Sequence, residues 1–84
     1  MYVHLGEKTL IKGDDIIGIF DLDNTTVMKS TREYLKKASK EKRVINVSYD
    51  LPKSFIVSSE EKYKVYISLL NAGTIALRVK NKKI

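Results

Sequence analysis

Cysteine is absent from the 84-residue chain, and histidine occurs only once, at position 4. Without cysteine the chain forms neither disulfide bonds nor thiolate metal sites, and nothing in it points to an oxidising compartment. A metal site of histidine and carboxylates needs at least three converging ligands, and the neighbours of His4 do not supply them. His4 shares a face with Tyr2 in a short predicted strand, where we expect a half-buried structural role.

Closely spaced glycines and long apolar runs are also missing. The four glycines, at positions 6, 13, 18 and 73, are too far apart for a dinucleotide-binding or Walker phosphate loop. No stretch approaches the roughly 20 apolar residues of a membrane span, and the N-terminus lacks the basic start and apolar run of a signal peptide. These absences predict a cytoplasmic chain with no cofactor and no membrane contact.

The chain is short, so its core is thin. A domain of this size buries only about 60–65% of the surface that its unfolded chain exposes. With 43% hydrophobic residues it still has enough apolar material for one sheet and a helix. Because association buries further surface, we expect a single domain, residues 1–84, that forms a homo-oligomer.

Positive charge is concentrated in two parts of the sequence. Sixteen Lys and Arg against ten Asp and Glu give a formal net charge of +6. Residues 1–23 hold two lysines against five acids, residues 29–43 hold seven bases against two acids, and residues 78–83 add four bases. Such regional charge attracts polyanions, so it is evidence about partners and not about the fold.

Short runs of β-branched and aromatic residues, separated by turn residues, predict six strands. They cover residues 2–5, 9–12, 16–20, 44–49, 54–58 and 63–69. The run from Ile16 to Phe20 predicts a strand buried on both faces. Segments 44–49 and 54–58 flank a turn at 50–53 and are expected to pair as a hairpin.

One long segment, residues 26–42, lacks Pro and Gly and predicts the main helix. Its apolar stripe comprises Met28, Thr31, Leu35 and Ala38, widened by Val27 and Tyr34. A basic row recurs on roughly the opposite side, at Lys29, Arg32, Lys36, Lys40 and Arg43. Residues 72–80 fit helical and strand spacing alike, and we favour a short C-terminal helix. The predicted fold class is α+β, a small antiparallel β-sheet packed by one main α-helix.

The segment from Phe20 to Thr26 resembles the first motif of haloacid-dehalogenase-type phosphatases, in which the first Asp is the nucleophile. Those enzymes need a doubly wound domain, but only about 60 residues follow here, too few for three βαβ units of about 30 residues each. No Asp occurs beyond Asp50. We therefore assign Asp21, Asp23 and Asn24 to ending a strand and capping a helix, and we expect no enzymatic activity.

The basic row has two interpretations. Phosphate contacts need only a cluster of cations on one surface, which gains affinity from counterion release. An ordinary solvated helix face has the same composition. Composition alone leaves nucleic-acid binding and simple solvation open.

A resemblance covers nearly the whole chain. It rests on the opening Met1–Gly6, the strand Asp15–Asp21, the turn Pro52-Lys53-Ser54, and Thr74 and Arg78 near the end. In order and spacing these resemble the RemA/RemB family of bacterial extracellular-matrix regulators, most closely its RemB branch. The resemblance implies an oligomeric DNA-binding transcriptional regulator of matrix and biofilm genes.

In the RemA branch, DNA contact is attributed to an arginine before the buried strand and to an arginine pair in the later turn. This sequence has none of the three. Asp15 stands at the first of those places and Leu51-Pro52 at the arginine pair. We expect double-stranded DNA to be held through phosphates only, by Lys12 and Lys53 first and then by Lys29, Arg32, Lys36 and Arg43. For Arg78 an ion pair or subunit contact is favoured over DNA. The missing arginines favour an alternative, an oligomeric interaction or structural protein that partners a related regulator and does not bind DNA.

Overall fold

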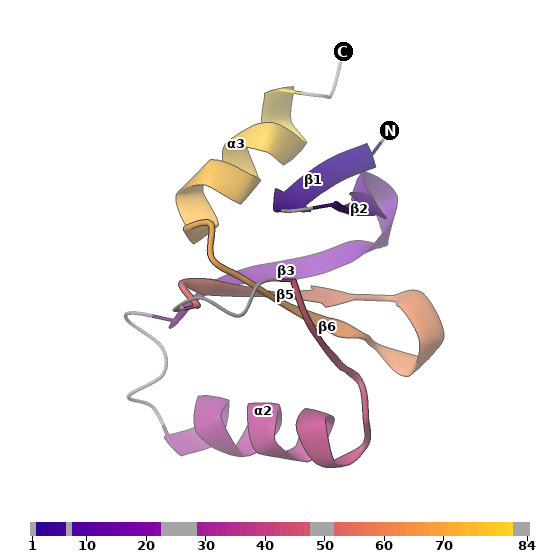
Figure 1. Cartoon of the computed structure of the whole chain (residues 1–84), viewed down its shortest axis with the longest axis vertical. Helices are drawn as coiled ribbons and strands as arrows, with labels where there is room; N and C mark the ends of the chain where they lie inside the picture. The colour runs from indigo at the N-terminus through magenta and orange to yellow at the C-terminus, as the bar shows by residue number, and fades with distance from the viewer. Residues whose placement is uncertain (1, 7, 23–28, 48–51, 82–84) are drawn as a thin grey trace.

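The computed structural model describes residues 2–6, 8–22, 29–47 and 52–81 (Figure 1). Its elements are β1 (Tyr2–Gly6), β2 (Thr9–Lys12), β3 (Ile16–Asp21), α2 (Lys29–Lys40), β4 (Val44–Asn46), β5 (Ser54–Ser58), β6 (Val65–Ser68) and α3 (Ala72–Asn81), with 3-10 turns at Gly13–Asp15 and Glu60–Lys62. The α+β fold class is confirmed. The C-terminal segment that fitted two spacings is a helix.

Four strands form the main sheet, in the order β3-β5-β6-β4, and β1 and β2 form a separate hairpin. Strands β3, β5 and β6 are mutually antiparallel, but β4 runs parallel to β6, with Val44 opposite Val65. The predicted hairpin between residues 44–49 and 54–58 is therefore wrong. Strand β5 is buried on both faces, so it needs two neighbours; β3 and β6 take those places and leave β4 at the outer edge.

Alternation along the strands sends side chains into two cores, one on each face of the sheet. On one face Phe55 and Val65 pack with Ala38 of α2. On the other, Ile56 and Tyr66 pack with Ile75 of α3 and with the inner side chains of the β1-β2 hairpin, Val3, Leu5 and Ile11. The result is three layers, with α2 below the sheet and with α3 and the hairpin above it in Figure 1. The second cover was missing from the prediction of one helix on one side.

Strand β3 differs from its prediction as a strand buried on both faces. It is an edge strand, and its Ile17 and Phe20 side chains are 57% and 41% exposed. The pairing with β5 is irregular between Ile16 and Gly18, and this bulge turns Ile17 toward the same side as Phe20. A side chain at Gly18 would meet the Phe20 ring at 2.7 Å, so glycine is what allows that ring to fold back over the strand.

The main helix lies inside its predicted range, and residues 26–28 of that range are outside the described part of the chain. It ends after Lys40 because Lys42 takes a left-handed conformation, with φ of 60°. The Arg43 N–H then donates to the Ala38 carbonyl at 2.9 Å and the Lys42 N–H to Ser39 at 3.0 Å. This pattern of two bonds is the Schellman end of a helix.

Candidate nucleic-acid interface

The outer face of α2 carries four cations in one row. Lys29, Arg32, Lys36 and Lys40 are all exposed, and their spacings of 3, 4 and 4 place them within one sector of the helix. Ala38, on the opposite side, is fully buried against the sheet. At 1.5 Å rise per residue the row is about 16 Å long. We call these four residues the α2 row.

Among the residues that the structure describes, the α2 row makes a single ion pair. Lys29 Nζ lies 3.9 Å from Glu33 Oε1, with the two side chains 86% and 65% exposed. An exposed pair of this kind contributes little and yields readily to a competing anion. The row therefore presents cations along a convex surface that phosphate groups can approach.

Arg43, predicted to extend this row, is placed elsewhere. Its guanidinium donates from Nε to Glu41 Oε1 and from Nη1 to the Tyr63 carbonyl, each at 2.8 Å, and lies 5.7 Å from the Tyr34 ring centroid. Tyr34 first, and then Glu41, raise the pKa of Arg43 above its ordinary value. The side chain is 15% exposed. Its charge joins the end of α2 to the β5-β6 turn.

Lys12 and Lys53 are both exposed, but they lie at opposite ends of β3. Lys12 ends β2 shortly before Ile16, where β3 begins. The Lys53 carbonyl accepts a hydrogen bond from the Leu22 N–H at 2.9 Å. Leu22 lies just beyond the other end of β3. Six residues of strand span about 20 Å. One chain therefore separates the six predicted DNA contacts into three residues of the α2 row, the structural Arg43, and two distant lysines.

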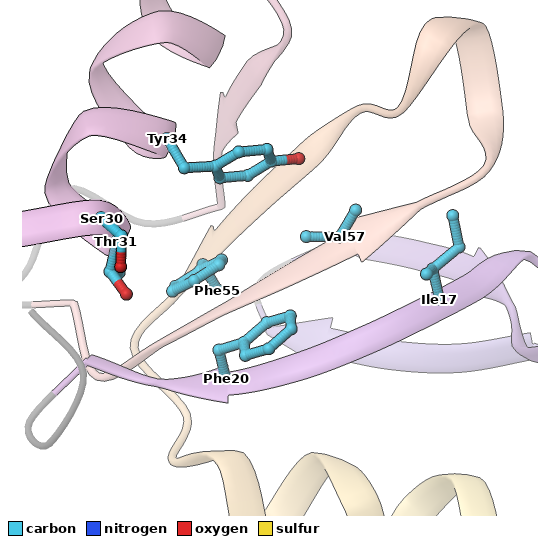
Figure 2. A pocket seen from close by; sticks show the side chains of 7 residues that line it. All are labelled: Ile17, Phe20, Ser30, Thr31, Tyr34, Phe55 and Val57. Atoms are coloured by element: carbon cyan, nitrogen blue, oxygen red, sulfur yellow. The ribbon is translucent and has the colours of Figure 1, made fainter. Parts of the chain in front are cut away.

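A hollow of about 340 Å³ lies between β3, β5 and the first half of α2 (Figure 2). It is lined by Ile17, Phe20, Ser30, Thr31, Tyr34, Phe55 and Val57. Phe20 stacks on Phe55 with ring centroids 4.9 Å apart and planes at 17°. Sequence reasoning missed this site, because regular alternation puts Ile17 and Phe20 on opposite faces and only the bulge in β3 brings them together.

The structure describes only part of the phosphatase-like motif. Asp21 ends β3, and Asp23 is outside the described residues. Over residues 2–6, 8–22, 29–47 and 52–81, no three His, Asp or Glu side chains gather closely enough to hold a metal ion. Neither α2 nor α3, the two long helices in this part of the chain, has the length and apolar character to cross a membrane.

A sequence model of the RemA-like family, described as extracellular matrix regulatory protein A-like, matches residues 2–79. The chain belongs to this family. It is also 36% identical over 78 residues to extracellular matrix regulatory protein B of Bacillus subtilis (strain 168), a match that covers 93% of this chain and 89% of that protein. The family resemblance seen in the sequence motifs is confirmed, and the family is one of extracellular matrix regulators.

Two of the residues that resemble the RemA-like pattern have structural partners within the chain. Thr74 donates its N–H to Asn71 Oδ1 at 2.9 Å, which caps the start of α3. Arg78 donates from Nη1 to the His4 carbonyl at 2.8 Å, which ties α3 to β1. His4 itself is exposed, not half-buried as predicted.

Proposed function

We propose that this RemA-like chain is a non-enzymatic, cytoplasmic DNA-binding transcriptional regulator of extracellular-matrix and biofilm genes. The observation that carries the proposal is the α2 row, four exposed cations along about 16 Å of one helix in a chain of net charge +6. Phosphates recur along a DNA strand at intervals that such a row can follow. Contacts of this kind position a protein on DNA without reading its sequence.

A homo-oligomer is part of the proposal, because one chain offers few phosphate contacts. The α2 row, Lys12 and Lys53 lie in separate places on one subunit, as described above. Linking copies makes each further contact intramolecular, so weak contacts add strongly through multivalency. The target sites are therefore stretches of double-stranded DNA long enough to touch several subunits.

The test is the salt dependence of binding to duplex DNA, measured by fluorescence anisotropy. The logarithm of the association constant should fall with the logarithm of salt concentration by about 0.9 for each neutralised phosphate. Replacing Lys36→Ala removes one contact of the α2 row and should reduce that slope by about 1 for each subunit that contacts DNA. Lys80→Ala is the matched control, since Lys80 is exposed on α3, on the other side of the sheet.

Two results would reject the proposal: no binding at about 50 mM salt, where electrostatic binding is strong, or an equal loss of slope in the Lys36 and Lys80 variants. Equal losses would mean that net charge, and not the α2 row, attracts the DNA. The slope separates these cases even when absolute affinities are low.

One observation favours a second candidate, an oligomeric interaction protein that partners a related regulator without contacting DNA. Asp15 places a carboxylate, which repels phosphate, at a position where the RemA branch implies an arginine. Ser59 Oγ lies 3.5 Å from Asp15 Oδ1. Binding to a related regulator, with no DNA affinity at low salt, identifies this candidate.

A further inference from the structure

The hollow beside α2 has the size and shape of a small-molecule site. Its volume of about 340 Å³ falls within the roughly 300–1,000 Å³ of ligand-binding pockets. Strand β5 forms its floor, β3 forms one wall and the first half of α2 forms the other (Figure 2). Gaps in a protein core are seldom much larger than one water molecule, whose share of liquid volume is about 30 Å³. The hollow is therefore too large to be a packing defect.

Three aromatic rings border this space. Phe55 is only 4% exposed and belongs to the core between the sheet and α2, so its ring is held in place. Phe20 stacks on it, and Gly18 leaves room for the Phe20 ring, because a Cβ there would lie 2.7 Å from that ring. Tyr34 reaches over the hollow from α2 (Figure 2). Rings arranged in this way favour a planar aromatic ligand, through stacked and edge-to-face contacts.

The hollow also has a polar end. Ser30 and Thr31 extend toward it from the first turn of α2, at the end away from Ile17 (Figure 2). In the part of the chain that the structure describes, neither hydroxyl is hydrogen-bonded to another protein group. A hydroxyl both donates and accepts, so one polar group on a ligand finds a partner here.

The lining favours a neutral ligand. None of the seven described residues that line the hollow is charged. Arg43 lies 5.7 Å from the Tyr34 ring centroid, but its guanidinium is already bonded to Glu41 and to the Tyr63 carbonyl. An ionised group in the hollow would lose water without gaining a counter-charge, which is strongly unfavourable.

We propose that this hollow binds a small, neutral, planar aromatic molecule that carries one hydrogen-bonding group. The ring system lies among Phe20, Phe55 and Tyr34, and the polar group bonds to the hydroxyl of Ser30 or Thr31. The inference goes beyond the proposed function and does not depend on DNA binding, because its tests contain no DNA.

Indole is a suitable probe, since it is planar and neutral and has a single N–H donor. The chain has no tryptophan, so indole can be excited at wavelengths that the protein does not absorb. The wild-type chain should shift indole emission to shorter wavelength, saturating at one indole per chain. We expect a Kd on the order of 0.1–1 mM, ordinary for a ligand of about nine non-hydrogen atoms.

Two results of this titration would overturn the proposal. A signal that grows without saturating would mean non-specific partition into apolar surface. No signal would mean that the hollow does not admit the ligand, as when another copy of the chain closes it.

A matched pair of variants tests the location. Ser30→Phe fills the hollow from an exposed position of α2 and should abolish saturable indole binding. Ser39→Phe makes the same substitution at an exposed position of the same helix, outside the hollow, and should keep the wild-type Kd. Circular dichroism checks that both variants fold. Equal affinities in the two variants would place indole elsewhere and overturn the site.

The polar end is tested with N-methylindole, which lacks the N–H. The quantity to compare is the ratio of the indole and N-methylindole affinities, because the added methyl group affects both proteins alike. Removing both hydroxyls, by Ser30→Ala combined with Thr31→Val, should lower this ratio by roughly 2–10-fold, the effect of one hydrogen bond. An unchanged ratio would overturn the role assigned to Ser30 and Thr31.

Discussion

Arg43 shows that a cation in a basic segment can serve the fold and not a ligand. Two hydrogen bonds at 2.8 Å and the Tyr34 ring hold its guanidinium between the end of α2 and the β5-β6 turn. We expect Arg43→Ala to lower the free energy of unfolding by about 1–2 kcal/mol, the usual effect of losing hydrogen bonds that involve a charged group. Arg43→Lys should recover little of this, because an ammonium lacks the planar fork of donors.

Urea unfolding measures this loss, and the DNA salt titration provides the contrast. Arg43→Ala should keep the slope of the wild-type titration, since its guanidinium is engaged within the fold. A reduced slope with unchanged stability would place Arg43 among the phosphate contacts and contradict the structural role.

Tyr66 makes the stability of the fold depend on alkaline pH. Its hydroxyl donates to Glu60 Oε1 at 2.6 Å, and burial, followed by that bond, raises the pKa of Tyr66 well above its ordinary value of 10.0. A raised pKa means that the folded state retains the proton more strongly than the unfolded state. The resulting stabilisation is fully present below about pH 10 and is lost as pH rises above it.

Unfolding by urea between pH 8 and 11 tests this dependence. The free energy of unfolding should fall above about pH 10 in the wild type and fall less in Tyr66→Phe, which has no proton to lose. Lysines titrate in the same range in both proteins, so only the difference between the two curves reports on Tyr66. Parallel curves would show that the phenol contributes nothing to the alkaline loss.

The termination of α2 illustrates how one residue limits an element. Lys42 adopts a left-handed φ of 60°, a conformation that glycine takes without cost and that L side chains rarely adopt. We therefore expect Lys42→Gly to stabilise the protein by about 1 kcal/mol, although it removes a side chain and a charge. Thermal unfolding measures this gain. Lys37→Gly, at an exposed position inside the helix, should destabilise the protein by a similar amount.

The elements themselves were largely predictable from the sequence, because their signals are local. Helix propensity and stripe spacing predicted α2, and β-branched runs predicted all six strands. The pairing of strands was not predictable to the same degree: a short turn after β4 suggested a hairpin with β5, yet β6 separates these strands. Strand order depends on which strand fills the centre of the sheet, and that is decided by contacts between residues far apart in the chain.

The candidate site was predictable where it depends on one helix and not where it depends on a bulge. The spacing of Lys29, Arg32 and Lys36 was enough to place them on one exposed face. The exposure of Ile17 and Phe20 was hidden, because an apolar run predicts burial on both faces and the irregularity at Gly18 leaves no mark in a hydrophobicity pattern. Arg43 continued the helical spacing of the row, but the helix ends before it.

At the scale of the whole molecule, the layers cover one face of the sheet more completely than the other. The sheet is covered by α3 and the hairpin on one face, while on the other α2 leaves β3 exposed beside the hollow. Patches of exposed apolar residues on small proteins mark interaction sites. A thin core and exposed apolar side chains on an edge strand are both stabilised when surface is buried against another copy of the chain.

Assembly and DNA binding should consequently be coupled. If the wild type binds DNA as a homo-oligomer that associates through the exposed apolar side chains of β3, the α2 rows of more than one chain contact the same duplex, so its salt slope reflects the cations of several chains. In Ile17→Asp the slope should fall to that of a single chain, since each chain then binds with its own contacts only and at about 0.9 per phosphate. Leu77→Asp adds the same negative charge at a side chain of equal exposure, so it should preserve the slope. An Ile17→Asp protein that is monomeric yet keeps the full slope would show that each chain binds independently, and that assembly serves a purpose other than DNA contact.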